Sequence, residues 1–396
     1  MGAPTRSRTA ARFSGLERPA TIAVHDVIEE LRGEGRTIVD LTKGEPDMST
    51  PDAVTDAAIA ALRAGHTHYT VGRGLAELRA AIAKKLATDN AVHVDPVDGV
   101  VVTPSAKHAL FVAMMTILDP GDEIIVPSPG WVSYRAMAHL VGARAVPAEL
   151  DGAAGFRLTT DVLRGCLTER TKAVLVNTPN NPTGRLLDGE ELDVLAEFAA
   201  EHDLLVITDE IYEVIRFGAG PHRSIGARPE CADRTLTVNG LSKSHAMTGW
   251  RLGYLAGPPD LMAVALAVSE QTVSCATSFV QHAALVAFGG ADEDVASMVT
   301  EYGRRRDLVV SALDGLGGIS CPAPDGTFYV FPDIRGANRG GSVEFAEWLL
   351  RGAGVATVPG PAFGPGGEGH IRLSFSVPTT VLTAALDRIA EALSGS

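Results

Sequence analysis

The sequence predicts an α/β protein in which helices alternate with the strands of a mostly parallel sheet. Two apolar, β-branched runs, VLVNTPNNPTG (174–184) and LLVITDEIYE (204–213), end in polar residues, as buried parallel strands do when they deliver side chains to a site. Apolar residues at three- and four-residue spacing predict helices over 51–65, 187–202 and 292–313. A chain of 396 residues with 45% apolar content and 42 glycines suits such a fold in two domains.

The order of these elements indicates one large domain inserted between two parts of a small one. Residues 1–50 are expected to form an N-terminal arm and part of the small domain, and residues 51–290 the large domain that carries the sheet. Residues 291–396 are expected to complete the small domain. The helix predicted at 292–313 is long enough to bridge the two domains.

A lysine and an arginine lie eight positions apart in NGLSKSHAMTGWRLGY, residues 239–254. Lys243 is a candidate Schiff-base nucleophile, because a deprotonated amine attacks carbonyl carbons. Arg251 can hold a phosphate dianion with its planar set of donors. Pyridoxal phosphate carries both a carbonyl and a phosphate, so it is the ligand that this pair favours. A surface lysine and a helix arginine would also be compatible with this stretch alone.

Other groups that this cofactor needs follow the two apolar runs. Asp209 can keep the pyridine nitrogen protonated, which makes the ring an electron sink. Asn181 and Tyr212 can donate to the phenolic oxygen of the cofactor. Taken separately, the two segments could be an ordinary Asn-Pro turn and an ordinary strand end.

The chain resembles a known family in many ordered blocks. Besides NNPTG, DEIY and SKSHAMTGWRLGY these blocks are LTKGEPDMSTP (41–51), HYTVGRGLAELRAAI (68–82), DPGDEIIVPSPGWVSY (119–134), GTFYVF (326–331) and IRLSF (371–375). They closely resemble the fold-type I pyridoxal phosphate enzymes, specifically the class I/II aminotransferases of the branch that contains bacterial aspartate and prephenate aminotransferases. The resemblance implies a large domain with a mostly parallel seven-stranded sheet flanked by helices, and a smaller α+β domain.

A helix N-terminus is expected to hold the phosphate. VVTPSAKHALFVAMM (101–115) predicts a strand, a tight polar turn and a helix, with Ser105, Ala106 and Lys107 at the start of the helix. Free backbone N–H groups and the helix dipole favour an anion there. The family commonly has a glycine at the position of Ala106, so here the backbone must accommodate a Cβ atom.

The resemblance implies further roles around the cofactor and the substrate. Trp131 is similar in position to the aromatic residue that stacks on the pyridine ring, and Ser242 to a hydroxyl near the phosphate. Tyr69 resembles the tyrosine that reaches the phosphate of the neighbouring subunit, which implies a homodimer with shared active sites. Arg372 would hold the substrate α-carboxylate through two parallel bonds, and the backbone at Gly44 would cover the same end of the substrate.

The expected reaction is transamination in two half-reactions, between an L-amino acid and a 2-oxo acid. In this branch a lysine at the position of Lys107 can contact a distal carboxylate, which favours aspartate, glutamate and their keto acids. Two departures from the family, Lys43 and Gly130, instead suggest a larger, aromatic or prephenate-like keto acid. Lys43 is equally compatible with a solvated lysine. A pyridoxal phosphate-dependent lyase or oxidase on the same scaffold is a further alternative.

Composition argues against several other classes. A net charge of -14 disfavours nucleic acid or an anionic membrane as the main partner, and no stretch has the length of a membrane span. The four cysteines are widely separated, which predicts a reducing cytoplasm and no metal site. His66 and His68 have no third ligand nearby in the sequence and are expected in a loop or at the dimer surface.

Overall fold

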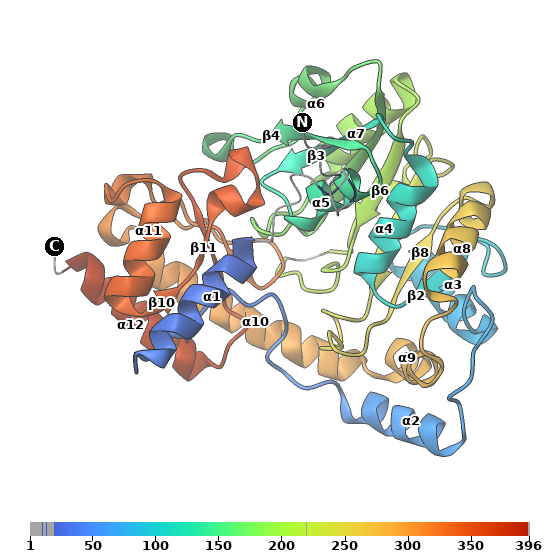
Figure 1. Cartoon of the computed structure of the whole chain (residues 1–396), viewed down its shortest axis with the longest axis horizontal. Coiled ribbons are helices and arrows are strands. Elements are labelled where there is room, and N and C mark those ends of the chain that lie inside the picture. The colour runs from blue at the N-terminus through green and yellow to red at the C-terminus, as the bar shows by residue number, and fades with distance from the viewer. Residues whose placement is uncertain (1–9, 11–12, 14–19, 219, 395–396) are drawn as a thin grey trace, which may run out of the picture.

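A seven-stranded sheet forms the middle of the computed structural model, which describes residues 10, 13, 20–218 and 220–394 (Figure 1). In spatial order its strands are β2 (Val100–Thr103), β8 (Gly253–Ala256), β7 (Thr235–Gly240), β6 (Leu205–Asp209), β5 (Thr171–Asn177), β3 (Glu123–Ser128) and β4 (Arg144–Glu149). Neighbouring strands are parallel except in the two pairs that β8 makes with β2 and β7. The mostly parallel sheet expected from the sequence is therefore confirmed.

Helices cover both faces of this sheet. One face packs against α4 (Ala106–Ile117), α5 (Ser133–Leu140) and α8 (Pro259–Val273), and the other against α3 (Ala76–Asp89), α6 (Thr160–Cys166), α7 (Gly189–Glu201) and α9 (Ser278–Gly290). The helix α2 (Asp52–Arg63) packs against α9. Along β5 the side chains alternate between the two faces of the sheet. Leu175 belongs to the apolar cluster under α4 and α5, whereas Val174 and Val176 belong to the cluster under α6 and α7. The apolar residues of β5 are thus buried on both faces, which explains their continuous run.

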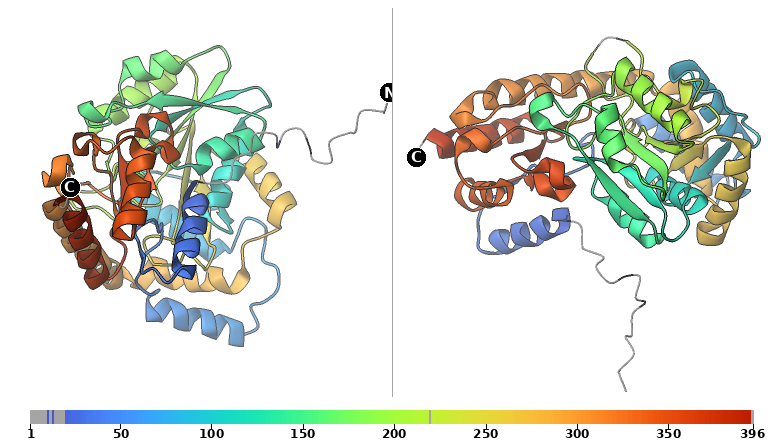
Figure 2. Two further views of the ribbon diagram at one scale, coloured as in Figure 1. Left: turned by 60° about the vertical axis from the view of Figure 1, so that its left-hand side comes forward. Right: turned by 90° about the horizontal axis from the view of Figure 1, so that it is seen from above.

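A smaller body combines both ends of the described chain. Its strands are β1 (Val39–Asp40), parallel to β10 (Val355–Ala356), and an antiparallel sheet of β11 (Val358–Pro359), β12 (Ile371–Ser374) and β9 (Tyr329–Val330). Its helices are α1 (Ala20–Gly33), α10 (Asp292–Leu313), α11 (Ser342–Trp348) and α12 (Thr379–Ser394). Ile28 and Leu31 of α1 pack with Leu350 and Ala356, and Figures 1 and 2 show α1 beside the C-terminal elements.

The helices predicted at 51–65, 187–202 and 292–313 are confirmed as α2, α7 and α10. Figure 1 shows α10 running from the region of α9 into the smaller body. We propose residues 50 and 290 as the domain boundaries; the first residues of the expected N-terminal arm lie outside the described part of the chain. Within that part, no helix has both the length and the apolar character needed to cross a membrane.

Candidate active site

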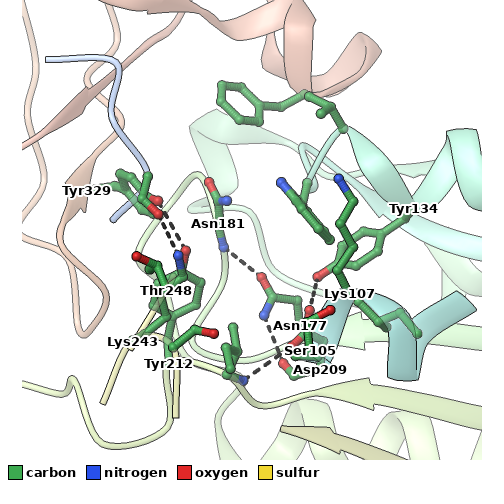
Figure 3. Close-up of a pocket in the computed structure, with 18 of the residues that line it drawn as sticks. Ser105, Lys107, Tyr134, Asn177, Asn181, Asp209, Tyr212, Lys243, Thr248 and Tyr329 are labelled. Atoms are coloured by element: carbon green, nitrogen blue, oxygen red, sulfur yellow. Dashed lines mark hydrogen bonds between the residues drawn. The ribbon is translucent and has the colours of Figure 1, made fainter. Parts of the chain in front are cut away.

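A cavity of about 330 Å³ opens at the carboxyl ends of β5 and β6, with β12 of the smaller body on its other side. Figure 3 shows its side chains, which come from both bodies. The predicted site residues that line it are Gly44, Ser105, Ala106, Lys107, Trp131, Asn181, Asp209, Tyr212, Ser242, Lys243, Arg251 and Arg372. Residues separated by more than 300 positions in the sequence thus meet at one cavity.

Lys243 lies in the segment between β7 and β8. Its Nζ donates to the backbone oxygen of Gly44 at 2.5 Å. Burial lowers the pKa of this amine to about 8, although the nearby carboxylate of Glu45 opposes the change. A pKa this low leaves an appreciable fraction of the amine deprotonated near neutral pH, as a nucleophile or a base requires.

Asp209, at the end of β6, is 3% exposed. Its Oδ2 accepts a hydrogen bond from the Tyr134 hydroxyl at 2.8 Å, and its Oδ1 accepts one from the Ile211 N–H at 3.2 Å. Burial raises the pKa of this carboxyl to about 6, while the two donors act in the opposite direction. The carboxyl group is therefore held in a fixed orientation beside the cavity.

Asn177, the last residue of β5, links the predicted residues to one another. Its Nδ2 donates to the backbone oxygen of Asp209 at 2.8 Å, and its Oδ1 accepts from the backbone N–H of Asn181 at 2.8 Å. Asn181 Oδ1 in turn accepts from Arg372 Nη1 at 3.0 Å. A chain of hydrogen bonds thus runs from the end of β6 to β12, part of it visible in Figure 3.

Arg372 is 3% exposed, yet one of its donors has no partner. The guanidinium donates through Nη2 to the backbone oxygen of Thr42 at 2.7 Å and lies between the rings of Tyr329 and Phe363. Its Nε atom is buried and makes no hydrogen bond within the described part of the chain. A buried cationic donor without an acceptor costs free energy. A bound anion would supply that acceptor, so the unpaired Nε atom of Arg372 supports an anion-binding role.

The turn between β2 and α4 forms the opposite end of the cavity. Ser105 caps α4 by accepting from the backbone N–H of His108 at 3.1 Å. A Cβ atom on Gly253 would lie 2.2 Å from the backbone nitrogen of Ala106, so only glycine lets β8 pass this close to the helix start. Arg251, two residues before Gly253, has a left-handed backbone with φ of 58°, a conformation that costs energy and is common at functional sites.

Lys107 and Trp131 lie together on the wall of the cavity. The ammonium lies 5.2 Å from the centre of the indole ring, within the range of a cation–π contact. Burial lowers the pKa of Lys107, and the positive charge of Arg251 lowers it further. The two positive charges would both be stabilised by anionic groups of a ligand.

The charges of the lining residues fit pyridoxal phosphate with an amino-acid substrate. Four of the lining side chains are cationic, those of Lys107, Lys243, Arg251 and Arg372. In the described part of the chain, Asp209 is the one carboxylate that lines the cavity. This excess of positive charge contrasts with the net charge of -14 of the whole chain. A ligand set with a phosphate and one or two carboxylates would balance it, and Asp209 matches a protonated ring nitrogen.

Three residues with predicted roles do not line the cavity of their own chain. Tyr69 is 87% exposed, and its expected role at a partner's site stays a prediction. Lys43 is exposed and is not among the described residues that line the cavity. A Cβ atom on Gly130 would lie 2.5 Å from the backbone oxygen of Pro127, so this glycine serves a close backbone approach and does not enlarge the cavity.

Several lining residues carry no assigned role in the sequence analysis. They are Thr42, Leu110, Val132, Tyr134, Asn177, Ile211, Thr248, Tyr329 and Phe363. Tyr134 lies within a recognisable block, and Asn177 ends a predicted strand, so both had a local signal. Phe363 had none, because it lies in a glycine-rich segment whose position depends on the packing of the smaller body.

One buried cluster could supply ligand atoms to a metal ion. Oxygen and nitrogen atoms of Glu210, Glu213 and His222 lie within 4.8 Å of one another. Lys85 already pairs with Glu213, and Asn90 donates to both carboxylates, at 2.9 and 2.6 Å. The carboxylates therefore have cationic and amide partners without an ion, and the cluster connects α3 to the segment after β6.

Comparisons with known proteins agree with this geometry. The family model described as aminotransferase class I and II matches residues 36–389. The chain is 45% identical to an aspartate aminotransferase of Musicola paradisiaca, over 97% of this chain and 96% of the relative, and 40% identical to a probable aspartate/prephenate aminotransferase of Aquifex aeolicus, over 98% and 99%. A solved structure of Thermus thermophilus aspartate aminotransferase with maleate superimposes with a TM-score of 0.91 at 40% identity, covering 98% of this chain and all (100%) of that one.

Proposed function

Because the chain belongs to the class I and II aminotransferases, which transfer amino groups between amino acids and 2-oxo acids with pyridoxal phosphate, we propose that it prefers dicarboxylic partners such as aspartate and glutamate. The observation that carries this proposal is a cation, Lys107, in addition to Arg251 for the phosphate, Lys243 for the carbonyl carbon and Arg372 for the α-carboxylate. Arg372 suffices for the α-carboxylate that every amino acid has, and Lys107 is available for a second carboxylate. The Thermus relative was solved with maleate, itself a dicarboxylate.

Residues at the two ends of the cavity divide the binding of the cofactor and the substrate. Arg251, Ser242 and the N-terminus of α4 hold the phosphate, where backbone N–H groups and the helix dipole favour a dianion. Asp209 would keep the ring nitrogen protonated, and Asn181 and Tyr212 would donate to the phenolic oxygen. Trp131 would supply an aromatic face for the ring. When bound, pyridoxal phosphate supplies an electron sink that stabilises the charge left at Cα after deprotonation.

Lys243 has two tasks in this scheme. Its amine would hold the cofactor through the carbonyl carbon, and as a free amine it would move the proton from the substrate Cα. Arg372, held by Asn181 and Thr42, fixes the substrate carboxylate so that the Cα–H bond faces this amine. The backbone oxygen of Gly44, which already accepts from Lys243, keeps the amine at the substrate end of the cavity.

The assembly that we propose is a homodimer in which each chain lends Tyr69 to the other chain's phosphate site. The segment around Tyr69 is anchored, since Gln281 bonds to Thr70 Oγ1 at 3.0 Å and accepts from the Leu75 N–H at 2.8 Å. An aromatic side chain on a fixed segment yet 87% exposed suits an interface. The four free cysteines support the cytoplasm as the location.

A comparison of substrates for the wild type and Lys107→Gln tests the dicarboxylic preference. We expect kcat/KM of the wild type to be highest with aspartate or glutamate, compared with phenylalanine and arginine as donors and prephenate as an additional acceptor. In Lys107→Gln, kcat/KM for aspartate should fall about 10- to 100-fold, because a hydrogen bond to a charged group contributes roughly 1.5–3 kcal/mol. The value for phenylalanine should change little.

Lys84→Gln, which removes an exposed lysine of α3, is the matched control. It should leave every rate unchanged. A wild type that prefers phenylalanine, or an equal loss for aspartate and phenylalanine in Lys107→Gln, would contradict the proposal.

A further inference from the structure

We propose that Tyr134 is a positioning residue for the cofactor: its hydroxyl holds the carboxylate of Asp209 in the charge state and orientation that pair with the pyridine nitrogen. This inference rests on the cofactor assigned above and is independent of the preferred substrate. Tyr134 lines the cavity but is directed at Asp209, as Figure 3 shows.

The hydrogen bonds of Asp209 leave it one orientation. Tyr134 donates to Oδ2 at 2.8 Å and the Ile211 N–H donates to Oδ1 at 3.2 Å, so the carboxyl group cannot rotate without losing both bonds. An ionised carboxylate has about four acceptor positions. Two therefore remain for a donor inside the cavity, which Asp209 lines.

A buried carboxylate needs such a donor to stay charged. Burial is the largest influence on the pKa of Asp209 and raises it, and the hydrogen bond from Tyr134 is the largest opposing influence. The attraction of Lys243 contributes least among the influences on Asp209. Tyr134 is thus the main side chain that favours the ionised form.

A phenol is well suited to this task because it is a neutral donor. Burial raises the pKa of Tyr134 well above its ordinary value, and the charge of Asp209 adds to the effect, so the hydroxyl stays protonated. An arginine in its place would stabilise the carboxylate but would also cancel its charge. With tyrosine, the negative charge of Asp209 remains available to a protonated ring nitrogen.

The position of Tyr134 is coupled to that of Trp131. The two rings meet edge to face, with centroids 5.4 Å apart and an interplanar angle of 83°, and the Tyr134 N–H donates to the Trp131 backbone oxygen at 3.1 Å. One turn of chain therefore presents the aromatic ring proposed to stack on the cofactor together with the donor to Asp209. The face of the pyridine ring and its nitrogen are positioned by the same turn.

The test is to measure how tightly pyridoxal phosphate binds to the apoprotein of Tyr134→Phe, as a function of pH. We expect the dissociation constant to rise about tenfold at neutral pH, equivalent to about 1.4 kcal/mol. The loss of affinity on acidification should also begin at a higher pH than in the wild type, because the pKa of Asp209, about 6 with Tyr134 present, would be raised further. The other titratable groups that act on Asp209 are Glu210, Lys243 and Tyr212, and all are unchanged in this variant.

Tyr302→Phe is the matched control. Tyr302 is fully buried and its hydroxyl bonds to Ser376 Oγ at 3.1 Å and to Asp47 at 3.4 Å, so the variant loses a comparable hydroxyl that does not bond to Asp209 and does not line the cavity. We expect wild-type affinity and pH dependence. A Tyr134→Phe protein with the wild-type dissociation constant and pH profile would overturn the proposal, as would equal weakening in both variants with no change in the profile.

A double-mutant cycle with Asp209→Asn separates the role of Tyr134 from any loss of folding. If Tyr134 acts through the charge of Asp209, Tyr134→Phe should add little to the weakening already caused by Asp209→Asn. Fully additive effects would overturn the proposal. A wild-type chain that fails to bind pyridoxal phosphate would refute the cofactor assignment itself, which is a distinguishable result.

Discussion

At Lys243, the protonation of one amine is governed by opposing neighbours. Burial is the largest influence and lowers its pKa to about 8, and the positive charges of Arg372 and Arg251 act in the same direction. Glu45 is the largest influence that raises the pKa. Glu45 also accepts from Thr248 Oγ1 at 3.1 Å, so its carboxylate has a fixed neighbour at the cavity rim.

Removal of the Glu45 charge should make Lys243 reactive at lower pH. The rate at which the apoprotein bonds covalently to pyridoxal phosphate depends on the free amine, so it should rise with pH and reach half its maximum near a pH of about 8 in the wild type. In Glu45→Gln the ammonium loses an attractive charge, and the midpoint should move to lower pH. The visible absorbance that develops on mixing measures this rate.

Glu34→Gln removes an exposed carboxylate that does not line the cavity and is not among the groups that shift the pKa of Lys243, so it serves as the control for this shift. Its midpoint should equal that of the wild type. A midpoint that stays in place or moves to higher pH in Glu45→Gln would contradict the assigned effect of Glu45 on Lys243.

The N-terminus of α7 stabilises the turn that carries Asn181. Asp188 and Glu191 form a reciprocal capping box, and the Glu191 carboxylate, 1% exposed, also accepts from the Leu158 N–H at 2.7 Å. Arg185 donates to both oxygens of the same carboxylate, at 2.8 and 2.6 Å. One buried carboxylate thus connects the helix to the end of the turn that follows β5.

We expect Glu191→Ala to destabilise the protein by about 3 kcal/mol, because removing one partner of a buried ion pair leaves the other uncompensated. The midpoint of thermal unfolding should fall by roughly 5 °C or more. Glu190→Ala is the control in the same turn: its side chain is 82% exposed, so the change should stay below about 0.5 kcal/mol. Equal midpoints for the two variants would show that the buried network contributes no more than the exposed pair.

The elements were predictable where a local pattern reports burial. The runs that became β5 and β6 are mostly apolar because both faces of these strands are covered, and the strands end at polar residues, Asn177 and Asp209. The spacing of apolar residues likewise located α10, which begins and ends where the pattern does. Such signals depend only on neighbours along the chain.

The partners of the site residues were not predictable in the same way. The bond between Tyr134 and Asp209 joins residues 75 positions apart, and that between Arg372 and Asn181 joins residues 191 apart. Neither distance follows from a periodic pattern, since both depend on how α5 and β12 pack against the sheet. Gly130 is a further example: the sequence connected it with a larger substrate, whereas the structure shows that its missing Cβ avoids the backbone oxygen of Pro127.

At the scale of the whole molecule, a mixture of two inactive variants can test whether sites are shared between chains. In a hybrid dimer of Lys243→Ala and Tyr69→Ala chains, one site has both defects and the other has none, if Tyr69 acts on the partner's phosphate. After equal amounts are unfolded and refolded together, the mixture should recover about a quarter of wild-type activity at limiting cofactor. Either variant refolded alone is the control and should stay far below that value. No recovery in the mixture would mean that Tyr69 acts within its own chain, and full activity of Tyr69→Ala refolded alone would mean that Tyr69 has no role in the site.

The pairing of β1 with β10 has a consequence for synthesis on the ribosome. Val39 pairs with Val355, and the backbone oxygen of Thr42 accepts from Arg372, which is 330 residues away. At the usual speed of translation, the segment that contains β1 leaves the ribosome on the order of tens of seconds before its partner strand exists. During that interval a nascent chain can assemble the central sheet around Asp209, but the site proposed for the substrate carboxylate cannot form until Arg372 has been added and can reach Thr42 and Asn181.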